Sequence, residues 1–370
     1  MVVAAAVAAA LYPQAALAHA QLVQSDPAPG AVLSEAPQSV TLIFSEPVTP
    51  VGAGVKVYAP SGAQAAPAVA TRGAVLTAKF GSSERGTFVV LWQVYSADTH
   101  PSRGSFAFSV GAPSPNPYST LLSTPEAGTA TPLGLGLQAL ARWVHFGGFA
   151  LAFGVIAYFV LTRRRERFGR LVLEGVALLV VAEPLSLAGQ LASLSFDGDT
   201  ALAVLGSDFG RVFFLRLAAA VIAWALIATD RPWAVLATGA VIALLDGVTA
   251  HALSSVPVAG QLLVAVHVAS MGLWVGGILA FLRAPDGRFG RYALITFGIA
   301  ATTGLVLGLA HTKFATALFD TDYGHVLLVK VAIVAVAASA ALLARRRTEA
   351  WFAFAAVGSA ALLAALPPPL

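Results

Sequence analysis

The chain has no cysteine among its 370 residues and only two methionines. Disulfide bonds and thiolate metal sites are therefore excluded, and a metal site has to use histidine, carboxylate, methionine or backbone groups. Charged residues are also scarce, at 11% of the chain, whereas a typical soluble domain has about 25%. This deficit leaves too little polar surface for a soluble fold and indicates a membrane protein.

The shortage of charge is uneven along the chain. Residues 19–111 have an ordinary polar content, residues 112–132 are rich in Pro and Ser and read as a linker, and residues 133–370 consist mostly of long apolar runs. The net charge of +4 does not indicate a nucleic-acid partner, because the arginines cluster between apolar runs, as membrane topology requires. We expect an exported domain followed by a membrane domain.

The first 18 residues are typical of a signal peptide. They form an apolar run that ends in Ala16-Leu17-Ala18, a small-residue cleavage pattern. The run is short for a membrane span, which needs about 20 apolar residues, and Pro13 interrupts it. We expect cleavage after Ala18, which makes His19 the first residue of the mature protein.

The exported part has the pattern of a small all-β Greek-key sandwich. Short segments rich in β-forming residues are separated by turn signals, and they span residues 39–44, 54–58, 74–80, 87–96 and 104–110. In the fourth segment, alternation places Phe88, Val90 and Trp92 on one face.

A copper-binding pattern follows that segment. Asp98 and His100 are two residues apart, so an extended chain points both side chains to one side. An amino-terminal His19 adds its α-amine and imidazole, which gives three nitrogens and one oxygen. Among divalent ions, Cu(II) suits this set best.

Residues 19–110 resemble the CopC family of periplasmic copper-binding proteins. The matching motifs are His19, Ser25-Asp-Pro27-Ala-Pro-Gly30, Phe44-Ser-Glu-Pro47, Val94-Tyr-Ser96-Ala-Asp98-Thr-His100-Pro101 and Gly104-Ser-Phe106-Ala-Phe108. The resemblance implies that the Cu(II) ligands are His19, Asp98 and His100. This domain lacks the methionines with which some members hold Cu(I).

Eight apolar stretches are long enough to span a membrane. They lie near residues 137–162, 171–192, 211–229, 233–253, 259–282, 291–312, 324–344 and 350–367. Arginine clusters at 163–170, 283–291 and 345–347 place those loops in the cytoplasm. The loops at 193–210 and 313–323 carry aspartates and should lie outside, so the histidines of the bundle fall in the outer halves of their helices.

These histidines are candidates for copper ligands or for a relay, because polar groups in lipid tend to mark ion pathways. The candidate path comprises His145, His251, His267, Met271, Asp246, His311 and His325. Met271 follows His267 by four residues on one helix face, and the pair could offer nitrogen and sulfur to Cu(I). Four further ionisable residues lie in the apolar stretches, and they either pair to neutralise charge or include carboxylates that continue a cation path: Glu183, Asp246, Arg216 and Lys330. We favour pairing for Glu183 and a path role for Asp246.

The membrane part resembles the CopD family of membrane copper proteins. The matching stretches are Arg142-Trp-Val-His145-Phe-Gly-Gly148, Thr249-Ala-His251-Ala, Val266-His267-Val-Ala-Ser-Met-Gly-Leu-Trp274-Val-Gly276-Gly277 and Thr321-Asp-Tyr323-Gly324-His-Val-Leu-Leu-Val-Lys330. Fusions of the two families are associated with copper uptake, and both resemblances together cover nearly the whole chain.

We therefore expect a multi-pass protein of the bacterial cytoplasmic membrane, with no catalytic residues, that acquires copper. Its exported domain would bind Cu(II) and pass it to a bundle that binds Cu(I). Copper ions and the lipid bilayer are the expected partners, with an extracytoplasmic copper chaperone or reductase as a further candidate and no nucleic acid. Two alternatives stay open: a membrane redox enzyme with haem or copper between paired histidines, and extracytoplasmic sequestration for copper resistance.

Overall fold

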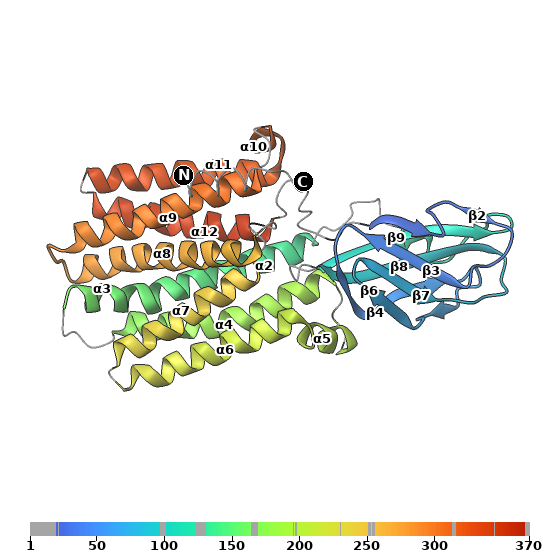
Figure 1. Ribbon diagram of the computed structural model, residues 1–370, viewed down its shortest axis with the longest axis horizontal. Coiled ribbons are helices and arrows are strands. Elements are labelled where there is room, and N and C mark those ends of the chain that lie inside the picture. The colour runs from blue at the N-terminus through green and yellow to red at the C-terminus, as the bar shows by residue number, and fades with distance from the viewer. Residues whose placement is uncertain are drawn as a thin grey trace. The chain divides into compact units, whose positions relative to one another are not determined.

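A computed structural model describes most of the chain. The described residues are 20, 22–96, 101–122, 131–163, 169–194, 196, 198–229, 231–250, 253, 256–312, 316–343 and 345–366. They form two compact units. One is a β-rich unit formed by the described residues of 17–134 and 190–209, and the other comprises the described residues of 135–189 and 210–370 and holds most of the helices (Figure 1).

The β-rich unit is a sandwich of two sheets. One sheet has the order β1-β3-β7-β6 and the other β2-β9-β8-β4-β5. The strands are β1 (Leu22–Asp26), β2 (Val32–Leu33), β3 (Ser39–Phe44), β4 (Val48–Tyr58), β5 (Gln64–Ala65), β6 (Val69–Arg72), β7 (Val75–Lys79), β8 (Gly86–Ser96) and β9 (Pro101–Val110). All five predicted strands are present, and β1, β2, β5 and β6 are additional. Strand β4 begins six residues earlier than predicted, with a register irregularity between Pro50 and Val55 where Gly52 and Gly54 adopt positive φ.

The two sheets share one apolar core. Alternate residues of β8 point into it, so Phe88, Val90 and Trp92 are buried, as the alternation predicted. Trp92 packs edge-on against Phe44 of the opposite sheet, with ring centroids 5.1 Å apart. The core thus joins β8 to β3 and fixes the strand ends that flank the predicted copper ligands.

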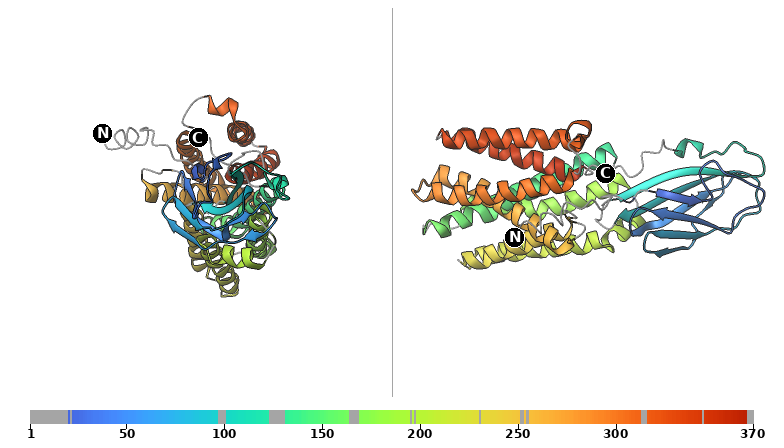
Figure 2. Two further views of the ribbon diagram at one scale, coloured as in Figure 1. Left: turned by 90° about the vertical axis from the view of Figure 1, so that its right-hand side faces the viewer. Right: turned by 45° about the horizontal axis from the view of Figure 1, so that its top comes forward.

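The second unit is an all-α bundle whose long helices run side by side (Figure 2). The helices of the chain are α2 (Pro132–Phe149), which continues through the π-helix η2 (Ala150–Gly154) into α3 (Val155–Leu161), then α4 (Arg170–Ser193), α5 (Gly198–Leu205), α6 (Asp208–Ile227), α7 (Pro232–Val248), α8 (Pro257–Arg283), α9 (Phe289–His311), α10 (Ala317–Asp320), α11 (Asp322–Leu342) and α12 (Arg346–Ala365). A short 3-10 turn, η1, covers Ser119–Leu121. The predicted fold class, an all-β sandwich followed by a helical bundle, is confirmed.

Each of the eight predicted spans corresponds to a helical segment. Seven are long and apolar enough to cross a membrane, and α7 is shorter, with 17 residues. Helix α7 ends at Val248, five residues before the predicted end of that span. At about 1.5 Å per residue, α7 is about 25 Å long, which is shorter than the about 30 Å hydrocarbon core.

The first span packs very closely against α8. A Cβ on Gly154 would overlap the carbonyl oxygen of Gly272, and a Cβ on Gly276 would overlap the carbonyl oxygen of Ala150. Glycine is required here because it lets two helix backbones touch, as in other membrane helix pairs. The π-helical turn of the first span lies at this contact, and such turns are frequent at functional sites.

Candidate functional site

The predicted Cu(II) ligands are flanked by paired strands. Strand β8 ends at Ser96 and β9 begins at Pro101, with Tyr95 paired to Pro101. Asp98 and His100 belong to the connection between these strands and, like His19, lie outside the described residues. The ligand set therefore stays a prediction.

Strand pairing brings the residues that flank all three predicted ligands to one end of the sandwich. Leu22, three residues after His19, pairs with Phe44 at the end of β3. Val48 at the start of β4 pairs with Ser96 at the end of β8. The connection between β3 and β4 lies between these two pairs and carries Glu46, a half-buried carboxylate.

Glu46 was not among the predicted ligands. Its motif, Phe44-Ser-Glu-Pro47, was noted only as part of a resemblance, because nothing in the sequence shows that β3 pairs with β1 while β4 pairs with β8. These pairings place a carboxylate at the same end of the sandwich as the ends of β8 and β9 that flank the predicted copper loop, and carboxylate oxygen is a suitable ligand for a divalent metal.

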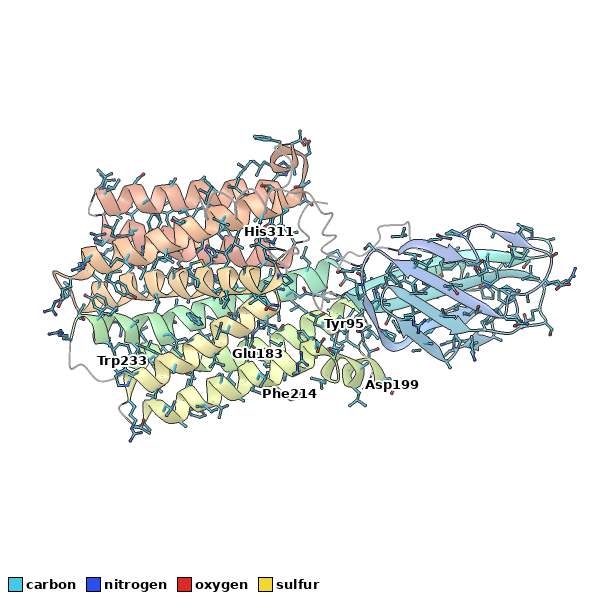
Figure 3. All side chains as sticks on the ribbon, viewed as in Figure 1. Tyr95, Glu183, Asp199, Phe214, Trp233 and His311 are labelled. Atoms are coloured by element: carbon cyan, nitrogen blue, oxygen red, sulfur yellow. The ribbon has the colours of Figure 1, made fainter. Side chains whose placement is uncertain are left out.

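Two buried hydroxyls lie next to the same loop. Tyr95 is 3% exposed and Ser102 is fully buried, and neither hydroxyl has a hydrogen-bond partner among the described residues. Burial raises the pKa of the Tyr95 phenol. Figure 3 labels Tyr95 in the sandwich and Glu183 in the helical bundle.

The bundle contains a buried cluster of ionisable side chains from four helices. We call it the His145 cluster, and it comprises His145 (α2), Glu183 (α4), Arg216 (α6) and Asp246 (α7). Nε2 of His145 is 3.1 Å from Oδ2 of Asp246, and Nδ1 of His145 is 3.7 Å from Oε1 of Glu183. Oδ1 of Asp246 is 2.7 Å from a terminal nitrogen of Arg216. His145, Glu183 and Asp246 are each at most 8% exposed.

This geometry favours an imidazolium at His145. Both ring nitrogens face carboxylate oxygens, which are acceptors, so each nitrogen is best served by carrying a hydrogen. A ring with two N–H groups has no lone pair for a metal. In agreement, no group of three or more His, Asp or Glu side chains in the described part of the chain is arranged to hold a metal ion.

The early end of α7 explains the position of Arg216. Its guanidinium reaches the carbonyl oxygen of Leu245 at 3.5 Å and the hydroxyl of Thr249 at 3.3 Å, as well as Asp246. A cation at a helix carboxyl end satisfies free carbonyls and interacts favourably with the helix dipole. Asp246 is thus paired with Arg216, whereas we had favoured a path role for it. Glu183, for which we had favoured pairing, faces the His145 ring. Lys330, the fourth residue of that prediction, forms no ion pair within the described residues.

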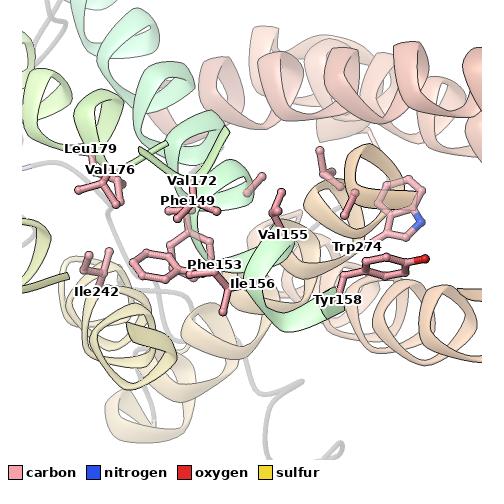
Figure 4. Close-up of a cluster of buried hydrophobic side chains, with 14 of the residues drawn as sticks. Phe149, Phe153, Val155, Ile156, Tyr158, Val172, Val176, Leu179, Ile242 and Trp274 are labelled. Carbon is pink, nitrogen blue, oxygen red and sulfur yellow. The ribbon is translucent and has the colours of Figure 1, made fainter. Parts of the chain in front are cut away.

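An apolar layer closes one side of the His145 cluster. One turn from His145, Glu183 and Asp246 along their own helices lie Phe149, Leu179 and Ile242, each at most 2% exposed. They belong to the large buried cluster around Phe153 and Tyr158 (Figure 4). Because α2 runs antiparallel to α4 and α7, all three lie on the side of the cluster away from the amino end of α2.

His267 and Met271 form a second candidate site on α8. Nδ1 of His267 is 3.0 Å from the carbonyl oxygen of Ala300 and 3.0 Å from the hydroxyl oxygen of Thr303. That hydroxyl donates its own hydrogen to Ile299 at 2.7 Å, so both contacts are acceptors and Nδ1 carries the ring hydrogen. The lone pair of a neutral ring is therefore on Nε2. Met271, one turn further along α8, is 6% exposed, and Lys330 acts on His267 electrostatically.

The remaining candidate histidines lie at helix ends. Nδ1 of His311 donates to the carbonyl oxygen of Leu307 at 2.8 Å, and Nε2 of His325 donates to that of Phe319 at 2.7 Å. His311 also contacts the ring of Tyr323, with centroids 5.9 Å apart. The contact between His311 and Tyr323 places His311 and His325 at the same end of α9 and α11. His251 lies outside the described residues.

The sandwich has paired strands that flank a predicted copper loop, and the membrane bundle contains the His145 cluster and the pair of His267 and Met271. This combination defines a class of membrane copper proteins. Residues 22–111 match the family described as CopC domain. Residues 133–261 match the copper resistance protein D-like N-terminal domain, and residues 286–366 match copper resistance protein D. The chain belongs to the CopC–CopD copper resistance family.

Two relatives that are similar in sequence agree with this assignment. The copper transport protein CutJ of Bacillus subtilis is 27% identical over 86% of this chain, which spans 66% of that relative's length. Copper resistance protein C of Xanthomonas campestris is 35% identical over 28% of this chain and 89% of its own length. The crystal structure of CopC from Methylosinus trichosporium OB3b is similar at 25% identity and a TM-score of 0.23, over 27% of this chain and 100% of that one.

Proposed function

We propose that this protein acquires copper and moves it across the bacterial cytoplasmic membrane. The amino-terminal sandwich faces outside and captures Cu(II) with His19, Asp98 and His100. Glu46 contributes a further oxygen at the same end of the sandwich. The membership of a copper resistance and transport family supports the choice of ion.

In the bundle, we propose His267 and Met271 as the central Cu(I) ligands. The observation that carries this assignment is the hydrogen bonding of His267. Nδ1 is committed to Ala300 and Thr303, so Nε2 presents a lone pair, as in metal-binding histidines whose other nitrogen is held by a protein acceptor. Imidazole nitrogen and thioether sulfur together suit Cu(I). His311 and His325, at one end of the bundle, are proposed as entry ligands.

Copper has to be reduced between the two sites, because the sandwich offers ligands for Cu(II) and the bundle offers ligands for Cu(I). The electron would come from an extracytoplasmic reductase, which is the partner class that the proposal requires.

Copper accumulation in cells tests this function. Cells that express the full chain should accumulate more copper than cells that lack it, and His19→Ala and His267→Ala should each remove most of the gain. Val266→Ala is the matched control, since Val266 precedes His267 on α8 and is 46% exposed. Equal accumulation with and without the protein would refute transport, and a purified chain with a Soret band would favour the haem alternative.

A further inference from the structure

We propose that the His145 cluster releases one proton, toward the amino end of α2, for each copper ion that the bundle binds. The inference rests on the proposed transport function and concerns what copper binding in the bundle is coupled to. It assigns a role to buried ionisable groups that copper binding leaves unused.

The proton is placed by the two unequal contacts of His145. Its Nε2 is within hydrogen-bond distance of Asp246, at 3.1 Å, whereas Nδ1 is 3.7 Å from Glu183, which is beyond a hydrogen bond. The Nδ1 proton is therefore held less tightly. In the transfer step the Nδ1–H bond breaks and an O–H bond forms at Oε1 of Glu183. This leaves a neutral imidazole and a carboxylic acid, with no change in total charge.

The charges around His145 favour Glu183 as the group that passes the proton on. Asp246 is bound on both oxygens, by Arg216 and by His145. Arg216 stays protonated in proteins, and so does Arg142 on α2, which acts on Asp246 electrostatically. Both arginines keep one charge throughout the step. When Glu183 gives its acquired proton to water, the cluster becomes more negative by one unit, which the arrival of one monovalent cation compensates.

Among the described residues, two buried amides near the cluster both lie on the same side of it. Gln138 precedes His145 by two turns on α2, and Gln190 follows Glu183 by two turns on α4, so both lie toward the amino end of α2. Gln138 is 4% and Gln190 is 6% exposed, and Oε1 of Gln190 has no hydrogen-bond partner among the described residues. A buried amide oxygen of this kind is suited to a water molecule. On the other side, Phe149, Leu179 and Ile242 close the path.

The cluster and the copper ligands are adjacent through α2. Phe146, the residue after His145, packs against the apolar group formed by Met271, Ala300 and Ala360. Ala300 supplies the carbonyl that holds His267. A cation that pulls Met271 and His267 together therefore displaces Phe146 and, with it, the ring of His145 relative to Glu183.

The test uses the purified full chain in detergent, in a weakly buffered nitrate solution that contains a pH-sensitive dye. Silver is the probe, because Ag⁺ has the charge and ligand preferences of Cu(I) and requires no reductant, and nitrate avoids precipitation. We expect one proton to appear in solution for each silver ion that binds to the bundle. Glu183→Gln should slow this proton release at least about tenfold, as expected for loss of a proton-transfer group.

Glu349→Gln is the matched control. Glu349 is 1% exposed and paired with Arg346 at 2.6 Å, outside the His145 cluster, so this variant should release protons as the unmodified protein does, and its thermal stability can be compared with that of Glu183→Gln. Silver binding without proton release, or an unchanged release rate in Glu183→Gln, would overturn the inference while leaving the copper site intact. Failure of the unmodified protein to bind silver would refute the proposed Cu(I) site itself, and the inference with it.

Discussion

Arg216→Met tests the energetics of the His145 cluster most directly. The substitution leaves two carboxylates, Glu183 and Asp246, with a single imidazolium between them in a buried site. Removing one partner of a buried ion pair costs about 3–5 kcal/mol. Protonating one carboxylate is the alternative, and at pH 7 this costs about 4 kcal/mol for a group that titrates near 3.9 in water, at 1.36 kcal/mol per pH unit. The two routes agree, so we expect a loss of about 4 kcal/mol at pH 7.

The sign of the pH dependence follows from the second route. If the mutant neutralises a carboxylate by binding a proton, its deficit relative to the unmodified protein should shrink by about 1.4 kcal/mol when the pH falls from 7 to 6. The double variant Arg216→Met/Asp246→Asn removes one charge of each sign and should recover most of the loss. Arg291→Met, an exposed arginine of α9, should change stability by less than about 0.5 kcal/mol. Unfolding of the full chain by SDS titration measures all four, and a double variant no more stable than Arg216→Met would refute the charge argument.

Three further predictions concern other parts of the chain. Gly276→Ala places a Cβ against the carbonyl of Ala150 and should lower the free energy of unfolding by about 1–3 kcal/mol in the same SDS titration. Gly298→Ala, with open space around its Cβ, should raise it by about 0.5–1 kcal/mol, and equal effects would contradict the close helix contact. Tyr95→Phe removes a buried hydroxyl that has no hydrogen-bond partner among the described residues and should stabilise the sandwich by about 1 kcal/mol. The amides of β8 and β9 should then exchange hydrogen more slowly, and faster exchange would show that the hydroxyl makes a stabilising hydrogen bond. Glu46→Gln should weaken Cu(II) binding by the full chain about 10–100-fold in a competition titration, and unchanged affinity would remove Glu46 from the site. Glu84→Gln is the control, because the Glu84 carboxylate accepts a hydrogen bond from Ser61.

The spans and the inward face of β8 could be predicted because their signals are local. Length and hydropathy determine where a helix can cross a membrane, and alternation determines which side of a strand is apolar. The same applies to the spacing of His267 and Met271, which needs only the helical repeat. By contrast, β2 and β5 have two residues each and exist only through their neighbours, β2 by parallel pairing with β9 and β5 by pairing with β4.

The partners of Asp246 could not be predicted, because they are distant in sequence. His145 precedes Asp246 by 101 residues, and hydropathy does not show which faces of α2, α6 and α7 meet. The early end of α7 was missed for the same reason. The apolar run continues past Val248, and the helix ends where Arg216 can bind the carbonyl of Leu245. The nearest local signal was the presence of ionisable residues in apolar runs, which identified the right residues but not their pairing.

Glycines allow the first span to pack between the His145 cluster and the site of His267 and Met271. The His145 cluster draws on helices of residues 133–261, whereas His267 lies on α8 and is held by α9, so α2 has to contact both groups of helices. Gly154 meets Gly272 and Gly276 backbone to backbone, with no side chain between them to absorb a displacement. A shift of α8 on metal binding is therefore transmitted directly to α2, and the π-helical turn at Ala150–Gly154 is where the first span can adjust. A larger residue at this contact should uncouple the two sites even if each keeps its own side chains, so Gly276→Ala should reduce the number of protons released per silver ion bound in addition to stability.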